Sequence, residues 1–190
     1  MDIKVKVLKE AGYEEALLGL SLSYYREGQD IETWWSPEKI IKAEKQARVL
    51  SFKGGGHSKF LESINVWFLV KASRGWHQEM DTYRVGTTKN SASSMHTLIK
   101  ERVTKDNFVD GTSQVLIDNL NELIESKVDI TTLKANLPEG YLQTRQCCMN
   151  YMTIQNIIRQ RTGHRLHYWD TFIDSLLLQV EHPELLRNTA

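Results

Sequence analysis

Residues 54–96 read GGGHSKFLESINVWFLVKASRGWHQEMDTYRVGTTKNSASSMH and gather anion-binding and titratable groups around one apolar strand. The strand is predicted over residues 64–70, where a short apolar run follows a glycine triplet and polar residues. After it come side chains that carry charge or form hydrogen bonds: Ser73, Arg74, His77, Gln78, Tyr83, Arg84, Lys89, Asn90, Ser91, Ser93, Ser94 and His96. A purely structural segment has little reason to carry so many, so we expect a charged ligand to dock here.

The segments around this stretch predict helices packed on one modest sheet. Lysines alternate with apolar residues over 3–7, which is typical of a half-buried strand, and apolar residues at helical spacing predict a helix over 13–25. A serine followed by proline opens a second helix over 36–52, because serine caps helices and proline suits their first turn.

The second half of the chain is predicted to be helical. Amphipathic patterns indicate helices over residues 115–124, 142–161 and 166–180, and Gly163 separates the last two. No repeat, low-complexity tract or long linker divides the sequence. We therefore predict a single domain over residues 1–190, long enough to bury one compact core.

Composition argues against nucleic acids and membranes as partners. The chain has 24 Lys and Arg residues against 24 Asp and Glu residues, so no overall field attracts a polyanion. No signal peptide opens the sequence, and no apolar run approaches the roughly 20 residues of a membrane span. The adjacent Cys147 and Cys148 suit neither a metal site nor a disulfide with each other. These features predict a cytoplasmic protein.

Several common catalytic motifs are missing. The sequence contains no GxSxG elbow, P-loop or Rossmann glycine pattern, which argues against hydrolase, kinase and classical dinucleotide chemistry. Its six histidines show no HExxH-type spacing. His164 and His167, three residues apart, come nearest to a ligand pair, and we predict no metal site.

Two features of the 54–62 segment each allow a functional and a structural explanation. Gly54, Gly55 and Gly56 could cradle a phosphate through their backbone N–H groups, or could form an ordinary turn. His57 and Glu62 would lie close together if a helical turn begins at Gly56; otherwise His57 caps a helix and Glu62 is solvated.

The arginines and serines also leave two possibilities open. Arg74, Arg84 and Arg145 could clamp a phosphate, because a guanidinium group binds phosphate oxygens in pairs, or could form surface ion pairs. Ser91, Ser93 and Ser94 could contact a nucleotide, or could cap a helix that starts near residue 95.

Taken in order, the motifs resemble those of the flavin-dependent thymidylate synthases, the ThyX family. That family has a Gly-His-x-Ser/Thr-x-x-Glu-His element, and this chain reads Gly56-His57-Ser58-Lys59-Phe60-Leu61-Glu62-Ser63, with the serine one place early and serine for the final histidine. His77-Gln78 matches the glutamine that follows the family's strand.

The family's Arg-His-Arg-x-x-Ser-x-Asn-Glu-x-Ser-x-Arg-Tyr motif is only partly kept. Asp81-Thr82-Tyr83-Arg84 takes the place of the basic triplet, so only Arg84 corresponds to it. Thr87 and Ser93 stand for the two serines, and Asn90-Ser91-Ala92-Ser93-Ser94-Met95-His96 replaces the end of the motif. Further along, Leu137-Pro138, Thr144-Arg145, Asn150, Arg161 and His164 follow the family order, while the terminal Glu-Ile-Arg is missing.

The resemblance implies an α+β fold with a central antiparallel sheet flanked by helices, assembled as a homotetramer. It assigns catalysis to Arg84 and Ser93, and flavin binding to His57, Ser58, Glu62, Arg84, Asn150, Arg161 and His164. Substrate binding falls to Gln78, Arg84, Ser91, Ser93 and Arg145. The cofactors would be FAD, NADPH and methylenetetrahydrofolate, with no metal.

The leading functional hypothesis is a divergent enzyme that converts dUMP to dTMP, or carries out a related flavin- and folate-dependent modification, such as hydroxymethylation, of a deoxyuridine nucleotide. Such chemistry needs no cysteine nucleophile, because the cofactor carries the hard step. The alternative is a nucleotide-binding or structural homologue that has lost flavin-dependent catalysis. A third hypothesis, an unrelated helical interaction module, leaves the ordered series of partial motifs unexplained.

Overall fold

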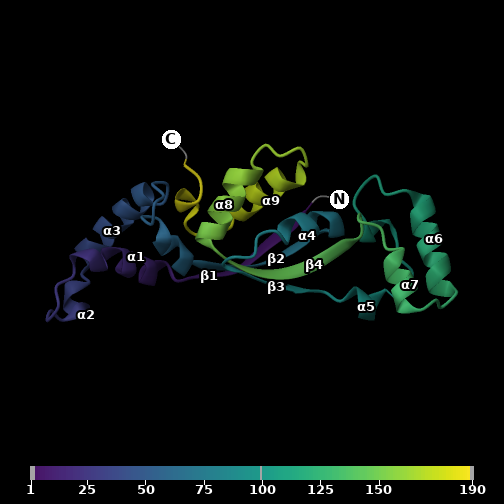
Figure 1. Cartoon of the computed structure of the whole chain (residues 1–190), viewed down its shortest axis with the longest axis horizontal. Coiled ribbons are helices and arrows are strands. Elements are labelled where there is room, and N and C mark those ends of the chain that lie inside the picture. The colour runs from purple at the N-terminus through teal and green to yellow at the C-terminus, as the bar shows by residue number, and fades with distance from the viewer. Residues whose placement is uncertain (1–2, 99, 189–190) are drawn as a thin grey trace.

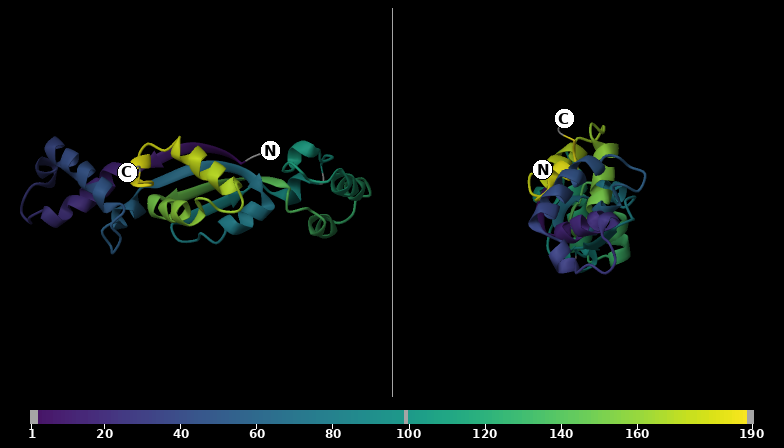
Figure 2. Two further views of the ribbon diagram at one scale, coloured as in Figure 1. Left: turned by 90° about the horizontal axis from the view of Figure 1, so that it is seen from above. Right: turned by 90° about the vertical axis from the view of Figure 1, so that its left-hand side faces the viewer.

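The computed structural model describes residues 3–98 and 100–188 and shows an elongated molecule with a sheet at its centre (Figure 1). One end carries an arm of helices α1 (Tyr13–Ser21), α2 (Ile31–Trp34) and α3 (Pro37–Leu50). The other end carries α6 (Gln114–Glu125) and α7 (Ile130–Ala135). Helices α4 (Arg74–Met80), α8 (Tyr151–Arg161) and α9 (Tyr168–Leu177) lie over the sheet, and a short α5 (Ser94–Thr97) follows its edge strand (Figures 1 and 2).

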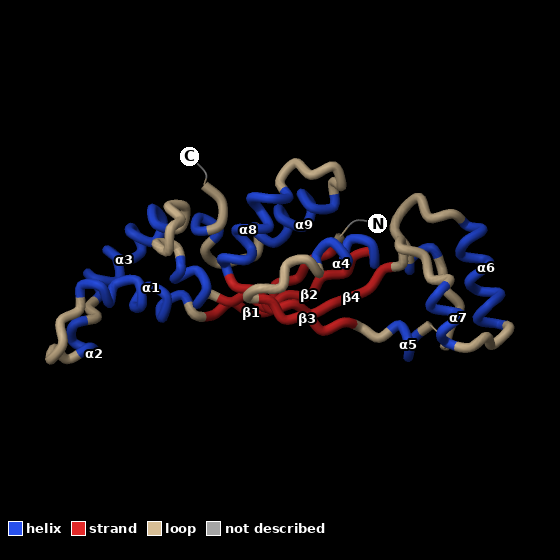
Figure 3. The backbone as a smooth tube through the Cα atoms, in the orientation of Figure 1, coloured by secondary structure: helices blue, strands red, loops and turns tan. Residues whose placement is uncertain are grey.

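The sheet has four strands, and every neighbouring pair is antiparallel. Its order is β1 (Lys4–Ala11), β2 (Asn65–Ser73), β4 (Leu142–Asn150) and β3 (Thr87–Ser91), so the last two strands in the sequence exchange places. Figure 3 shows the four strands together in the middle of the molecule. In β2, buried residues alternate with half-buried ones, because one face of the strand packs under the helices. The expected α+β fold with a central antiparallel sheet and flanking helices is confirmed.

The helix expected over residues 142–161 is wrong in its first half. Residues Leu142–Asn150 form β4, which pairs with β2 on one side and β3 on the other, and only Tyr151–Arg161 is helical. Asn150 marks the true start, because its side chain accepts a hydrogen bond from the Thr153 N–H and caps α8. The apolar spacing of this segment fits both a helix and a strand, and pairing with the neighbouring strands decides for the strand.

The strands expected near residues 3–7 and 64–70 are present, and so are the helices expected over 13–25, 36–52, 115–124 and 166–180, with shifted ends. Gly163 lies between α8 and α9 with a φ of 69°, a conformation that glycine adopts easily. Within the described residues, no helix is both long enough and apolar enough to cross a membrane.

Buried apolar side chains form two clusters instead of the one core expected. The main core lies between the sheet and its helices and includes Phe68, Trp76, Trp169 and Phe172. The satellite core lies within the α6–α7 end and consists of Leu98, Val103, Phe108, Ile117, Leu120, Leu133 and Leu137. The organisation as a single domain stays a prediction.

Candidate functional site

The candidate site is built around residues 79–86, the last two residues of α4 and its connection to β3, which we call the α4–β3 turn. Helix α4 follows β2 directly, and the Ser73 side chain caps it by accepting a hydrogen bond from the Trp76 N–H. Gly86 ends the turn with a φ of 62°, and its carbonyl accepts a hydrogen bond from the Asn150 N–H. Successive side chains of this turn reach three different groups of residues.

The first group is a cation cluster centred on Asp81. The Arg145 guanidinium donates to both Asp81 carboxylate oxygens at 2.8 and 3.0 Å, and the Lys89 ammonium donates to one of them at 3.1 Å. Burial would raise the Asp81 pKa, but the hydrogen bonds from the two cations outweigh it and hold that pKa below its ordinary value. Two cations share one carboxylate, so the cluster retains one net positive charge.

Two titratable groups beside this cluster are held neutral. His77 is fully buried and its Nε2 lies 2.9 Å from the Gln143 carbonyl; burial lowers its pKa to about 4. Cys147 faces Lys89 across the β3–β4 pair, and burial raises the pKa of its thiol to about 11. A protonated thiol is a poor nucleophile, so Cys147 is unsuited to covalent catalysis at neutral pH.

The second group surrounds Arg161 at the end of α8. Its guanidinium donates to Glu79 at 3.1 Å and to the Tyr83 hydroxyl at 3.0 Å, and lies 3.1 Å from the His164 Nε2. It also sits over the Trp169 ring, whose Nε1–H donates to the same Glu79 carboxylate at 2.9 Å. Arg161 and His164 thus lie together, and Arg161 is engaged by protein groups.

The third group is a set of three neighbouring hollows that all include Glu62. Their volumes of ≈ 510, ≈ 610 and ≈ 860 Å³ fall within the roughly 300–1,000 Å³ of ligand pockets. We call them the loop, turn and arm hollows. The loop hollow adjoins the glycine triplet, the turn hollow adjoins the α4–β3 turn, and the arm hollow adjoins α1 and α3.

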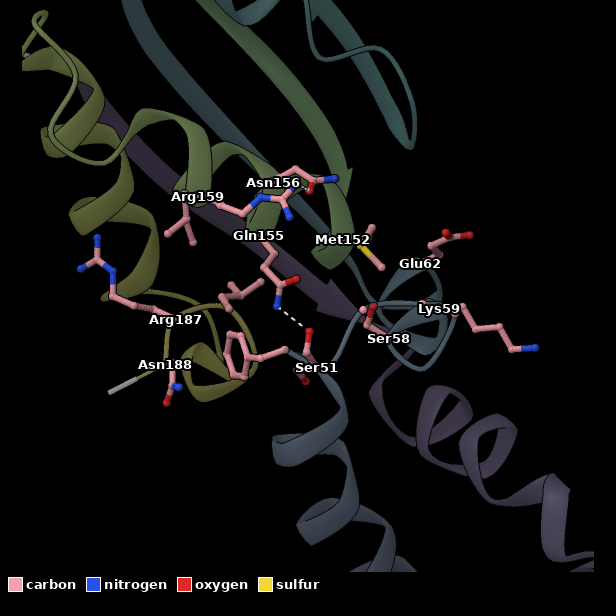
Figure 4. Close-up of a pocket in the computed structure, with 16 residues that line it drawn as sticks. Ser51, Ser58, Lys59, Glu62, Met152, Gln155, Asn156, Arg159, Arg187 and Asn188 are labelled. Carbon is pink, nitrogen blue, oxygen red and sulfur yellow. Dashed lines mark hydrogen bonds between the residues drawn. The ribbon is translucent and has the colours of Figure 1, made fainter. Parts of the chain in front are cut away.

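Figure 4 shows the loop hollow between the glycine triplet and α8. Gln155 reaches across from α8 and donates to the Ser51 carbonyl at 3.0 Å, which ties α8 to the end of α3. Lys59 and Arg159 bring positive charge to the walls. Gly55 and Gly56 have positive φ angles and open space where a side chain would be, so a ligand can approach their backbone closely.

The structure brings many of the predicted flavin residues to these hollows. His57 and Glu62 both line the arm hollow, because turns at 54–58 and a 3₁₀ helix, Lys59–Ser63, fold the segment back. Ser58 lines the loop hollow, and Arg84 and Asn150 line the turn hollow. Asn150 also has the structural task of capping α8.

The predicted substrate residues are less closely grouped. Ser91 is the register partner of Arg145 across β3 and β4. Ser93 occupies the N-cap position of α5, but its hydroxyl makes no capping hydrogen bond. Gln78 donates to Glu139 at 3.1 Å and is engaged away from the cation cluster. Arg74 donates to the Leu137 carbonyl at 2.6 Å, Arg84 lines the turn hollow and Arg145 belongs to the cation cluster, so the three arginines have separate contacts.

Sequence reasoning missed Asp81 and Glu79 as members of the site, and it named Lys89 only among the polar residues of the 54–96 stretch. The place of Lys89 next to β4 could have been found from the run Thr87–Ser91, had its β-branched threonines been recognised as an edge strand. Asp81 and Glu79 carry no local signal for their arginine partners, because Arg145 and Arg161 lie 64 and 82 residues away in the sequence.

Comparison with known proteins supports the fold. No protein-family model matches the chain, and no curated protein sequence matches it. Among solved structures, thymidylate synthase X (ThyX) from Helicobacter pylori with FAD and dUMP is similar at a TM-score of 0.81, with 20% identity and coverage of 98% of both chains. A second complex of that enzyme with FAD and dUMP gives the same TM-score.

The UMP/dUMP methylase PolB from Streptomyces cacaoi, bound with 5-Br dUMP, is similar at a TM-score of 0.70. The two chains are 13% identical, with 93% of this chain and 89% of PolB covered. The likeness therefore shows that this chain has the ThyX fold over nearly its whole length, as the motifs led us to expect.

Proposed function

We propose that the protein is a cytoplasmic, flavin-dependent enzyme that methylates dUMP to dTMP, or carries out a related flavin- and folate-dependent modification of a deoxyuridine nucleotide. One observation carries the proposal: over 98% of its length the chain has the fold of an enzyme whose structure holds FAD and dUMP. The cation cluster and the three hollows supply chemistry suited to such ligands.

The nucleotide phosphate would be bound by the cation cluster. Arg145 offers a planar fork that matches phosphate oxygens, and Lys89 adds a second charge. Their side chains are only 17% and 14% exposed, so a bound phosphate would be partly shielded from water, and its charge-assisted hydrogen bonds would be strengthened. Asp81 would compete with the phosphate for both cations.

The hollows fit a flavin nucleotide. The glycine triplet can present backbone N–H groups to phosphate oxygens, Lys59 and Arg159 line the loop hollow, and Arg84 lines the neighbouring turn hollow. Ser58 and Asn150 offer hydrogen-bonding side chains, and Glu62 lies where the hollows meet. Bound flavin would supply hydride chemistry that no side chain of this protein can provide.

The remaining assignments extend this proposal. NADPH would reduce the flavin and methylenetetrahydrofolate would donate the one-carbon unit, while Arg84 and Ser93 would act at the reacting end of the nucleotide. Arg84 is solvent-exposed in this chain, as expected for a residue whose binding site is completed by side chains of another subunit. We therefore propose a homotetramer, to be checked by light scattering of the purified protein.

The first test is the visible absorbance spectrum of the purified protein, recorded after adding excess FAD and removing the unbound fraction. We expect a retained flavin spectrum and, with NADPH, methylenetetrahydrofolate and dUMP, formation of dTMP or a related product. Nucleotide binding without retained flavin would overturn the enzyme proposal in favour of a nucleotide-binding homologue.

The second test measures dUMP affinity by titration calorimetry. Arg145→Ala should weaken binding about 10- to 100-fold, because a charge-assisted phosphate contact contributes roughly 1.5–3 kcal/mol. Asp81→Asn should strengthen binding several-fold, since it removes the competing carboxylate. Arg102→Ala is the matched control, because Arg102 pairs with Glu125 far from the site. Equal affinity in all four proteins would rule out the cation cluster as the phosphate site.

A further inference from the structure

Outside the candidate site, three side chains of types that can bind a metal ion meet where β1 contacts the segment after α9. Glu10 lies on β1, and Glu181 and His182 lie in the segment after α9, 171 residues later. One ligand atom from each residue, two carboxylate oxygens and one ring nitrogen, all lie within 4.8 Å of one another. We call these residues the Glu10 triad.

The framework around the triad holds two of its members in place. The Glu10 carboxylate accepts hydrogen bonds from the Tyr151 hydroxyl at 2.8 Å and from the Glu181 N–H at 2.9 Å. The His182 ring stacks on Tyr13 with centroids 3.4 Å apart, and its backbone N–H donates to the Tyr151 hydroxyl at 3.2 Å. Hydrogen-bonded carboxylates and a fixed imidazole are what metal sites need beyond their direct ligands.

A further carboxylate and an exposed cation lie close to the triad. Glu184 lies 3.8 Å from the His182 Nδ1, which adds a third carboxylate next to the ring. The nearby cation Arg48 is 3.8 Å from Glu184, and its side chain is 65% exposed, so solvent weakens its effect.

We propose that Glu10, Glu181 and His182 bind a divalent transition metal, with Zn²⁺ the ion that the donor set fits best. Two carboxylates and one imidazole match the oxygen and nitrogen ligands of zinc, and the imidazole favours zinc over Mg²⁺ or Ca²⁺. Zinc–ligand bonds of about 2.0–2.2 Å place ligand atoms roughly 3.5 Å apart, so closure needs side-chain shifts of about 1 Å. The bound ion fastens the C-terminal segment to β1.

The experiment uses the full-length protein after treatment with a chelator and dialysis. Zn²⁺ is titrated into it by calorimetry, and the melting temperature is recorded with and without Zn²⁺. We expect one Zn²⁺ per chain and a rise in melting temperature of about 5 °C at saturating metal, because an ion that binds only the folded state stabilises it. No detectable binding at Zn²⁺ concentrations up to about 0.1 mM would overturn the proposal, because a site with a weaker dissociation constant would add little stability.

Variants locate the ion. Glu181→Gln changes an exposed side chain and should fold normally, and it should weaken Zn²⁺ binding at least tenfold, as should His182→Gln. His96→Gln, an exposed histidine far along the chain, is the matched control and should bind as the wild type does. Unchanged binding in Glu181→Gln and His182→Gln would overturn the proposal. Mg²⁺ binding as tight as Zn²⁺ binding would also overturn it, since the imidazole would then contribute nothing.

Discussion

The buried imidazole of His77 makes the stability of the folded protein depend on pH. Its pKa is about 4 in the folded protein, below the ordinary value of 6.5, so the unfolded chain binds the extra proton between these values. The contribution of neutral His77 to the free energy of unfolding is therefore present above pH 6.5 and is lost as the pH decreases toward 4. We expect His77 to account for a loss of about 2 kcal/mol between pH 7 and pH 5, measured by urea unfolding.

The change in the free energy of unfolding between pH 7 and pH 5 separates the titration of His77 from a general loss of core packing. His77→Gln should lower stability at both pH values but remove the extra loss at pH 5. His96→Gln, at an exposed position, should retain the full loss. If His77→Gln kept the same loss between pH 7 and pH 5 as the wild type, the buried ring would not be its source.

At the scale of elements, Gly86 joins the α4–β3 turn to the cap of α8. A Cβ at Gly86 would lie 2.3 Å from the Asn150 Nδ2, and Asn150 cannot move aside without losing its capping bond to Thr153. Gly86→Ala should therefore cost about 1 kcal/mol for its positive φ and about 1–2 kcal/mol more for the lost cap. Urea unfolding followed by circular dichroism measures the loss.

Gly54 provides the matched control for this substitution. Its φ of 66° is close to the 62° of Gly86, but nothing lies within 4 Å of a Cβ built there. Gly54→Ala should therefore cost only the backbone term, about 1 kcal/mol. Equal losses from the two substitutions would show that the contact with Asn150 is unimportant for stability.

Helices and strands with a regular pattern of apolar residues were predictable from the sequence. A strand whose structure depends on pairing with adjacent strands was not. Strand β2 has an apolar run, and α6 has a strongly amphipathic pattern, so both were found. Strand β4 carries Gln143, Thr144, Arg145 and Gln146, and becomes a strand because β2 and β3 flank it. One of these polar residues, Arg145, belongs to the cation cluster, and the Gln143 side chain accepts a hydrogen bond from its guanidinium at 3.3 Å.

At the scale of the whole molecule, the sequence motifs indicated residues of the candidate site but not the contacts between them. The partial ThyX motifs pointed to the glycine triplet, which adjoins the loop hollow, to Arg84 of the α4–β3 turn, which lines the turn hollow, and to Arg145, which donates to Asp81. The carboxylates that engage Arg145 and Arg161 became apparent only in three dimensions. Pairings over such sequence distances depend on the packing of the entire chain.

The two hydrophobic cores predict two levels of stability within one chain. The satellite core has far fewer buried residues than the main core, and its segment leaves the sheet after β3 and returns at β4. Amides in α6 and α7 should therefore exchange hydrogen at least about tenfold faster than amides in β2 and β4. Hydrogen exchange followed by mass spectrometry measures both regions in one experiment.

A substitution inside each core tests whether the two regions open separately. Leu133→Ala removes a buried side chain of the satellite core and should speed exchange in α6 and α7 while leaving β2 and β4 protected, because such a cavity costs about 2–5 kcal/mol locally. Ile157→Ala, in the main core, should speed exchange throughout the chain, since the satellite region is attached through the sheet. If Leu133→Ala sped exchange equally in β2 and β4, the two cores would unfold as one cooperative unit.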